Sequence, residues 1–248
     1  MHRTAIIVLF IAATFFPVRI ALADTSPEAA PIVRALEARY QNAKTLKAIF
    51  LERYMDGRNG LEVESGTVYF SRPGRMRWEY ESPENKLFIS DGKTVWFFVP
   101  ADHTVTRAPM KQSADWRTPL ALLTGKVKLS RLCNSIELTA DVPGKPGDAV
   151  LRCVPRGEKR PASNAGEGSD ADAAITSPNQ PFDQVLLEVN PMTGQLADVR
   201  VLEPGGIELD YRFDNWDENL PIPDSMFRFH APAGVAIVDE SQALSASP

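Results

Sequence analysis

Apolar side chains recur at every second position along most of this chain, a pattern typical of β-strands that have one buried and one solvated face. The clearest example is the segment in which Met76, Trp78 and Tyr80 alternate with charged residues. Strands are predicted at 46–51, 65–70, 75–80, 86–90, 94–99, 104–109, 126–138, 149–154, 184–190, 196–203 and 207–213. Because nearly all connections between these segments are short, the sequence predicts a long antiparallel meander.

Two helices are predicted beside the meander. Ser26 and Pro27 are the residue types of an N-cap and a first helical position, and apolar residues then recur at helical spacing through residue 44. Thr118 and Pro119 begin a shorter, leucine-rich helix that ends at Gly125. A helix this short and apolar must cover another apolar surface.

The first 23 residues have the organisation of a secretory signal peptide. Arg3 supplies a positive charge, an apolar run of 13 residues (4–16) follows, and Ala-Leu-Ala at 21–23 forms a cleavage site. Spanning a bilayer needs roughly 20 apolar residues. The alternative, a buried first helix, leaves a proline break and an arginine unexplained. We therefore expect a soluble mature protein that begins at Asp24, because no cysteine follows the cleavage site to carry a lipid anchor.

The mature chain is acidic. The whole sequence has 27 Lys and Arg against 32 Asp and Glu, and removing the two arginines of the leader changes the net charge from −5 to −7. A negative surface repels phosphate backbones, and the chain has no basic block to offset this repulsion. Nucleic acid is therefore not an expected partner.

We expect one domain, 24–248, with one insertion. The segment 155–180 contains no aromatic residue and a single large aliphatic one, Ile175, among many small and polar residues. This composition predicts a mobile surface insertion.

Cys133 and Cys153 are the two cysteines of the chain. Export permits a disulfide, and the two residues flank a predicted hairpin, so cross-strand pairing is geometrically feasible. Two buried thiols are the alternative.

The usual motifs of catalysis are missing from the sequence. His103 and His230 have no metal-ligand spacing, and there is no nucleophile elbow, C-x-x-C, Walker loop or dinucleotide-binding glycine motif. We expect neither an enzyme, nor a metal site, nor a cofactor.

Two predicted strands are apolar on both faces, which is the most informative feature of the sequence. The segments 87–89 and 95–99 each require a cover on two sides. One sheet with two helices meets this requirement if the sheet curls and the helices fill its concave side. Such a geometry forms either a packed core or a pocket of the size of a lipid.

The sequence also resembles a known family, the LolA-type periplasmic carriers of outer-membrane lipoproteins. The segments that carry the resemblance, in order along the chain, are SGTVYFSRPG at 65–74, MRWEY at 76–80, SDGKTVWF at 90–97, TPLALL at 118–123 and FRFHAPAGV at 227–235. The resemblance implies an α+β fold, an unclosed antiparallel β-barrel whose concave apolar face is covered by helices. Acyl chains are expected to bind between the sheet and this lid.

The resemblance also assigns roles to individual residues. Arg72 matches an arginine that latches the lid by donating hydrogen bonds to helix carbonyls, whereas its residue type alone favours an exposed turn arginine. The residues expected to line the lipid cavity are Met76, Trp78, Phe50, Leu87, Ile89, Trp96 and Phe98, and those expected to form the lid are Leu36, Tyr40, Leu120, Leu122 and Leu123.

The implied function is a periplasmic, monomeric carrier of acylated lipoproteins. Its implied partners are an inner-membrane ABC-type complex that loads it and an outer-membrane lipoprotein receptor that unloads it. A carrier of another lipid, such as a glycolipid or pigment, and a lipoprotein-sensing regulatory module on the same fold are the alternatives. An esterase acting on the bound lipid is a remote one, because a nucleophile motif is missing.

Overall fold

The computed structural model describes residues 24–57, 60–110, 123, 128–156 and 183–239. The predicted leader, 1–23, lies outside the described residues. So do residues 157–182 of the region around the predicted insertion, and all of the predicted helix at 118–125 except Leu123.

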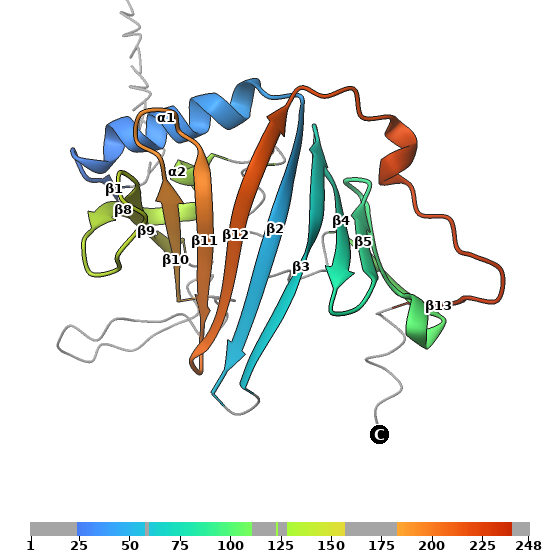
Figure 1. The fold of residues 1–248 in the computed structure, drawn as a ribbon. Helices are drawn as coiled ribbons and strands as arrows, with labels where there is room; N and C mark the ends of the chain where they lie inside the picture. The colour runs from blue at the N-terminus through green and yellow to red at the C-terminus, as the bar shows by residue number, and fades with distance from the viewer. Residues whose placement is uncertain (1–23, 58–59, 111–122, 124–127, 157–182, 240–248) are drawn as a thin grey trace, which may run out of the picture.

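A single curled sheet contains every strand of the described residues (Figure 1). The strands are β1 (Asp24–Thr25), β2 (Thr45–Asp56), β3 (Gly60–Ser71), β4 (Arg75–Ser82), β5 (Lys86–Ser90), β6 (Thr94–Val99), β7 (Thr104–Pro109), β8 (Cys133–Thr139), β9 (Ala149–Pro155), β10 (Gln184–Val189), β11 (Leu196–Glu203), β12 (Ile207–Glu218) and β13 (Ala236–Asp239). Their order across the sheet is β1-β8-β9-β10-β11-β12-β2-β3-β4-β5-β6-β7-β13. The predicted meander is confirmed, and the pairing of β12 with β2 joins its two halves at the centre of the sheet.

The two outermost strands are short and parallel to their neighbours, unlike the antiparallel pairs between them. Asp24 and Thr25 pair with β8 at one edge, and β13 pairs with β7 at the other. Exposed sheet edges invite pairing with other chains, and very short edge strands are one way of limiting it. The sheet therefore stays open, as expected for an unclosed barrel.

The first helix, α1 (Ala29–Asn42), lies across one end of the sheet (Figure 1). The Ser26 Oγ accepts a hydrogen bond from the backbone N–H of Ala29 at 3.3 Å, which supplies the predicted cap. The side chains that α1 buries are those of Ala29, Ile32, Val33, Leu36 and Tyr40. They share one hydrophobic core with one face of the sheet, here called the inner face.

The strand predicted at 126–138 is wrong at residues 129–132, and its first two residues lie outside the described part of the chain. Leu129–Leu132 form a single helical turn, α2, and strand β8 begins only at Cys133. The Glu37 carboxylate of α1 accepts a hydrogen bond from the Leu129 N–H at 2.9 Å, and Leu129 is buried. This tertiary contact favours a helical turn at a place where the local pattern of apolar residues predicted a strand.

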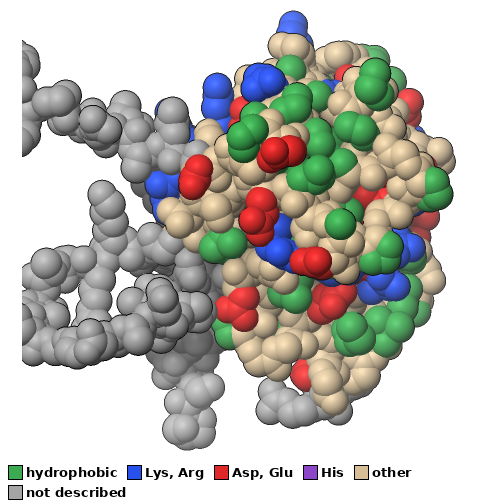
Figure 2. Space-filling model, turned by 90° about the vertical axis from the view of Figure 1, so that its left-hand side faces the viewer, with side chains coloured by type: hydrophobic (Ala, Val, Ile, Leu, Met, Phe, Trp, Pro, Cys, Tyr) green, Lys and Arg blue, Asp and Glu red, His purple; other side chains and the backbone are tan. Residues whose placement is uncertain are grey.

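A segment that we call the strap (residues 219–239) follows β12 and runs along the side of the sheet to β13 (Figure 1). It includes the 3₁₀ turn η3 (Asp224–Phe227), and a second such turn, η1 (Pro100–Asp102), connects β6 to β7. At the opposite end of the molecule, beside β8, the surface mixes hydrophobic, acidic and basic side chains (Figure 2).

Candidate functional site

The inner face carries its side chains in rows that cross neighbouring strands, because directly paired residues of antiparallel strands point to the same side. Starting from the end beside the C-terminus of α1, the rows are Leu46, Phe70, Met76 and Ser90; then Ala48, Val68, Trp78 and Phe88; then Phe213, Phe50, Gly66, Tyr80 and Lys86; then Tyr211, Glu52 and Glu64. The first two rows are apolar except for Ser90, and the last is polar. A boundary of polarity therefore crosses the inner face.

Trp78 is at the centre of the apolar part and is fully buried. Its ring lies 4.7 Å from that of Phe50 and 6.1 Å from that of Phe70, both with edge-to-face geometry. The rings of Tyr211 and Phe213 lie 5.7 and 6.2 Å away. Aromatic pairs at such distances add to the free energy of burial. The Trp78 Nε1 is buried without a hydrogen-bond partner among the described residues.

A polar cluster borders this aromatic group. The Tyr80 hydroxyl donates to Glu52 Oε2 at 2.8 Å, and the Tyr211 hydroxyl donates to Glu52 Oε1 at 3.1 Å. Glu52 is only 8% exposed, so these charge-assisted hydrogen bonds offset part of the free-energy cost of burying its carboxylate. Nearby, Lys86 in the row of Tyr80 forms an ion pair with Glu64 in the row of Glu52.

Helix α1 covers the inner face with the residues predicted for it. Leu36 and Tyr40 are both fully buried in the common core. The Tyr40 hydroxyl accepts a hydrogen bond from the Leu196 N–H at 3.0 Å, and burial raises the pKa of this phenol above its ordinary range. Of the other predicted lid residues, Leu123 is buried in the same core, whereas Leu120 and Leu122 lie outside the described residues.

Arg72 contacts the end of this covering helix. Its Nη1 donates to the backbone carbonyl of Gln41 at 2.9 Å, one of the last carbonyls of α1, which have no partner within the helix. Its Nε and Nη2 are buried and have no hydrogen-bond partner among the described residues. Burial lowers the pKa of the guanidinium. The side chain is therefore not the solvated turn arginine that its residue type alone suggests.

Met76, Trp78 and Phe50 lie on the inner face, but the other four predicted lining residues do not. Register pairs Trp78 with Phe88, and Phe88 with Phe97, so Phe88 and Phe97 are the inner-face residues of β5 and β6. Leu87, Ile89, Trp96 and Phe98 face the opposite side, here called the outer face. The prediction was wrong because both segments are apolar on both faces, so hydrophobicity left the direction of each side chain open.

The strap covers part of the outer face and explains why β5 and β6 are apolar there. The rings of Phe98 and Phe229 lie 5.6 Å apart. Arg77 donates to the carbonyl of Met226 at 3.1 Å, and the guanidinium of Arg75 lies 5.4 Å from the centre of the buried Phe227 ring. The sequence pattern did not predict this cover, although the aromatic residues at 227 and 229 were a signal for it.

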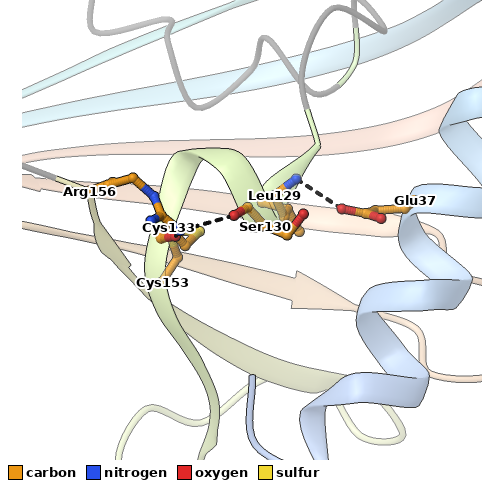
Figure 3. The surroundings of a disulfide bond; sticks show 6 residues. All are labelled: Glu37, Leu129, Ser130, Cys133, Cys153 and Arg156. Carbon is orange, nitrogen blue, oxygen red and sulfur yellow. Dashed lines mark hydrogen bonds between the residues drawn. A yellow bond between two sulfur atoms is a disulfide. The ribbon is translucent and has the colours of Figure 1, made fainter. Parts of the chain in front are cut away.

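The two cysteines form a disulfide between β8 and β9, beside α2 (Figure 3). Arg156 is near this bond and donates to the carbonyls of Ser130 and Cys133 at 3.2 and 3.0 Å (Figure 3). Together with the contact of Glu37 with Leu129, these bonds connect α1, α2 and the β8–β9 pair. The disulfide is thus part of the structure that positions α1.

Metal-ligating side chains do not gather in the part of the chain that the structure describes. Within those residues, no group of three or more His, Cys, Asp or Glu side chains is arranged to hold a metal ion. The helices described there include none that is long and apolar enough to cross a membrane.

Comparisons with known proteins find similar sequences among outer-membrane lipoprotein carrier proteins. The family model described as "Outer membrane lipoprotein carrier protein LolA" matches residues 41–142. An outer-membrane lipoprotein carrier protein of Nitrosospira multiformis is 26% identical over 219 residues, which cover 87% of this chain and 92% of that protein. One of Pseudomonas aeruginosa (strain UCBPP-PA14) is 27% identical over 233 residues, 94% of this chain and 97% of that protein.

A solved structure shares the fold. The crystal structure of an uncharacterized conserved protein from Thermus thermophilus superposes with a TM-score of 0.50 at 13% identity. The superposition covers 86% of this chain and 99% of that one.

Proposed function

We propose that this chain, which is similar to the LolA family, carries lipoproteins across the periplasm with their acyl chains held against the inner face of the sheet. The observation that carries the proposal is the match to outer-membrane lipoprotein carrier proteins along 87% and 94% of the chain. The inner face supports it, because two successive rows of buried side chains are apolar but for Ser90. The role is binding and transport.

Within this proposal, the sheet and α1 are the two walls of the lipid site. Met76, Trp78 and Phe50 line the sheet side, and Leu36, Tyr40 and Leu123 line the opposite side. The described side chains of both walls pack in one core. Acyl chains therefore enter only when α1 moves outward, and Arg72 opposes this movement through its bond to Gln41.

The free energies explain why such a latch is useful. Transfer of a CH₂ group out of water is worth about 0.8 kcal/mol, so three chains of about 15 groups amount to roughly 36 kcal/mol. Non-covalent affinities saturate near ~18 to 21 kcal/mol, in magnitude, so a carrier that shielded every group would never release its cargo. A closed empty state weakens net binding, because part of the free energy of lipid binding is used to open the protein.

The cellular context extends the same proposal. The protein acts in the periplasm after removal of residues 1–23, and the position of Asp24 and Thr25 in a sheet strand supports cleavage immediately before them. An ATP-driven inner-membrane complex loads it, and an outer-membrane receptor accepts the lipoprotein. Residues 24–248 form one domain in this proposal.

The test is a release assay on spheroplasts that contain a labelled triacylated lipoprotein. Purified mature protein is expected to move the label into a soluble complex, and label that stays with the membrane would refute the carrier function. Neighbouring positions of β2 supply matched variants, since Ala48 is fully buried on the inner face and Ile49 is 47% exposed on the outer face. Ile49→Glu is expected to retain release and Ala48→Glu to lose it, compared after melting curves show both to be folded.

A further inference from the structure

The unpaired indole nitrogen of Trp78 is unusual for a group buried this deeply. Buried polar atoms in proteins are nearly always hydrogen-bonded, and each exception calls for an explanation. Trp78 is 0% exposed, and its Nε1 has no partner among the residues that the structure describes. Another tryptophan that packs against the same core follows the ordinary rule, because the Trp216 Nε1 donates to the Leu196 carbonyl at 2.8 Å.

The surroundings of Trp78 restrict what could accept its proton. Phe50, Phe70 and Phe213 lie around the ring and provide no acceptor other than their π faces, which are weak ones. The fourth ring beside it belongs to Tyr211, whose hydroxyl donates to Glu52 and makes no hydrogen bond with the indole nitrogen. An acceptor brought by a ligand must therefore enter an apolar environment, which disfavours a charged group. A neutral carbonyl oxygen on an otherwise apolar molecule meets both requirements.

The rows of the inner face show where such a carbonyl would lie. Trp78 is in a row that is apolar throughout, and the next row, farther from the C-terminus of α1, contains Tyr80 and Lys86. Glu52 follows in the row after that. In an acylated glycerol, the ester carbonyls occupy the same position between the hydrocarbon chains and the polar head.

We propose that the Trp78 indole N–H donates a hydrogen bond to an ester carbonyl of a bound acylglycerol group. The acyl chains then extend over the apolar rows toward α1, and the head points to the polar rows around Glu52. This inference rests on the proposed carrier function and adds the orientation of the lipid and a residue that selects ester-linked chains. Apolar walls alone recognise only the volume of a chain, whereas a buried donor discriminates against a ligand that leaves it unpaired.

The experiment compares two synthetic triacylated lipopeptides that differ only at the glycerol linkages. One has two ester-linked chains, and the other has ether-linked chains of the same length, which lack the ester carbonyls. Calorimetric titration of the wild-type protein is expected to give a Kd about 3- to 10-fold lower for the ester, the range of a single neutral hydrogen bond. In Trp78→Phe this ratio is expected to fall to about 1, because the phenyl ring keeps apolar contact but has no donor.

The control is Trp96→Phe, which alters a tryptophan on the outer face and is expected to keep the preference. Failure of both lipopeptides to bind the wild-type protein would contradict the carrier function itself. Equal Kd values for the two would leave that function standing and overturn the carbonyl site, as would a preference that survives in Trp78→Phe.

A second measurement uses only the wild-type protein and so does not require that any variant folds. The infrared band of a ¹³C-labelled ester carbonyl moves to lower frequency when the oxygen accepts a hydrogen bond. The bound ester lipopeptide is expected to show this shift in the wild-type protein, and a band at the position of a carbonyl in hydrocarbon solvent would contradict the proposal.

Discussion

Buried polar atoms are the positions at which small changes should have the largest effects, since an unpaired buried donor or acceptor costs about 1–3 kcal/mol. Arg72, Trp78 and Glu52 all have buried polar atoms, and each residue lies on the inner face of the sheet or at its contact with α1. They differ in the hydrogen-bond partners of these atoms. Glu52 has two phenolic donors, Arg72 has one helix carbonyl, and the Trp78 indole nitrogen has no partner among the described residues.

We predict that Arg72→Leu loads lipoprotein but releases it poorly to outer membranes. Loss of a charged donor to the Gln41 carbonyl removes about 1–2 kcal/mol of bias toward the closed state, so handover should slow by roughly 5-fold or more. The measurement is transfer of a labelled lipoprotein from the purified complex to outer-membrane vesicles. Arg34→Leu is the matched control, because Arg34 is exposed on α1, the helix that Arg72 contacts. Transfer at the wild-type rate by Arg72→Leu would refute the latch.

A pair of carboxylic acids on the outer face makes stability depend on pH. Asp198 and Asp210 are 5% and 1% exposed and share a hydrogen bond, with Arg53 and Arg212 paired to them. Burial, followed by the hydrogen bond and charge of Asp210, raises the pKa of Asp198 to about 8. The ordinary pKa of an aspartate is about 3.9, so between about pH 4 and pH 8 the folded state binds the extra proton. The contribution of this group to stability is therefore complete at low pH and declines as the pH rises.

We predict that Asp198→Asn flattens this dependence. Asparagine is neutral at every pH and keeps a donor for Asp210, so the variant should not lose stability on this account. Between about pH 5 and pH 7 the wild type should lose roughly 2–3 kcal/mol more of its unfolding free energy than the variant. Urea denaturation at both pH values measures the difference, and parallel curves for the two proteins would show that Asp198 is ionised throughout.

At the level of elements, the outer face illustrates how one sheet can be apolar on both sides. Helix α1 covers one face, and the strap covers part of the other through Phe227 and Phe229. The end of the strap is held at the edge of the sheet by the parallel pairing of β13 with β7. A bidentate ion pair between Arg107 and Asp239 adds to this pairing. An element with so little regular structure depends on these few contacts.

We predict that Phe227→Ala detaches the strap. Truncation of a fully buried phenylalanine costs about 3–5 kcal/mol in a packed core, and here the loss should fall on residues 219–239. Limited proteolysis should cleave this segment faster than in the wild type, with Arg228→Ala as the exposed neighbouring control. An unchanged cleavage rate together with a lower melting temperature would place Phe227 in the global core.

At the level of the whole molecule, the disulfide acts on the unfolded chain as well as on the fold. Cys133 and Cys153 are separated by 20 positions, and the chain-entropy model assigns such a loop about 3 kcal/mol of stabilisation. We predict that reduction, or replacement of both cysteines by serine, lowers the melting temperature by several degrees. Scanning calorimetry with and without reductant measures it, and identical transitions would exclude a stabilising role.

Much of this architecture was predictable from the sequence. Strand alternation from Leu46 onward predicted the meander, and the capping residues before α1 predicted the helix that covers it. The arginine at 72 was found only through family resemblance, because its local context is that of an exposed turn. The strap was missed, since its short 3₁₀ turn and edge strand have little periodicity of their own.

The sequence by itself determined which residues of a strand share a face, because alternation follows from the geometry of the extended chain. Only the tertiary structure decided which of the two faces is the inner one in β5 and β6, where Phe88 and Phe97 point inward and Leu87, Ile89, Trp96 and Phe98 point outward. The physical reason is that both faces are covered by apolar elements. Hydrophobicity then does not decide which way the side chains of β5 and β6 point. The hydrogen-bonded register with β4 decides it instead.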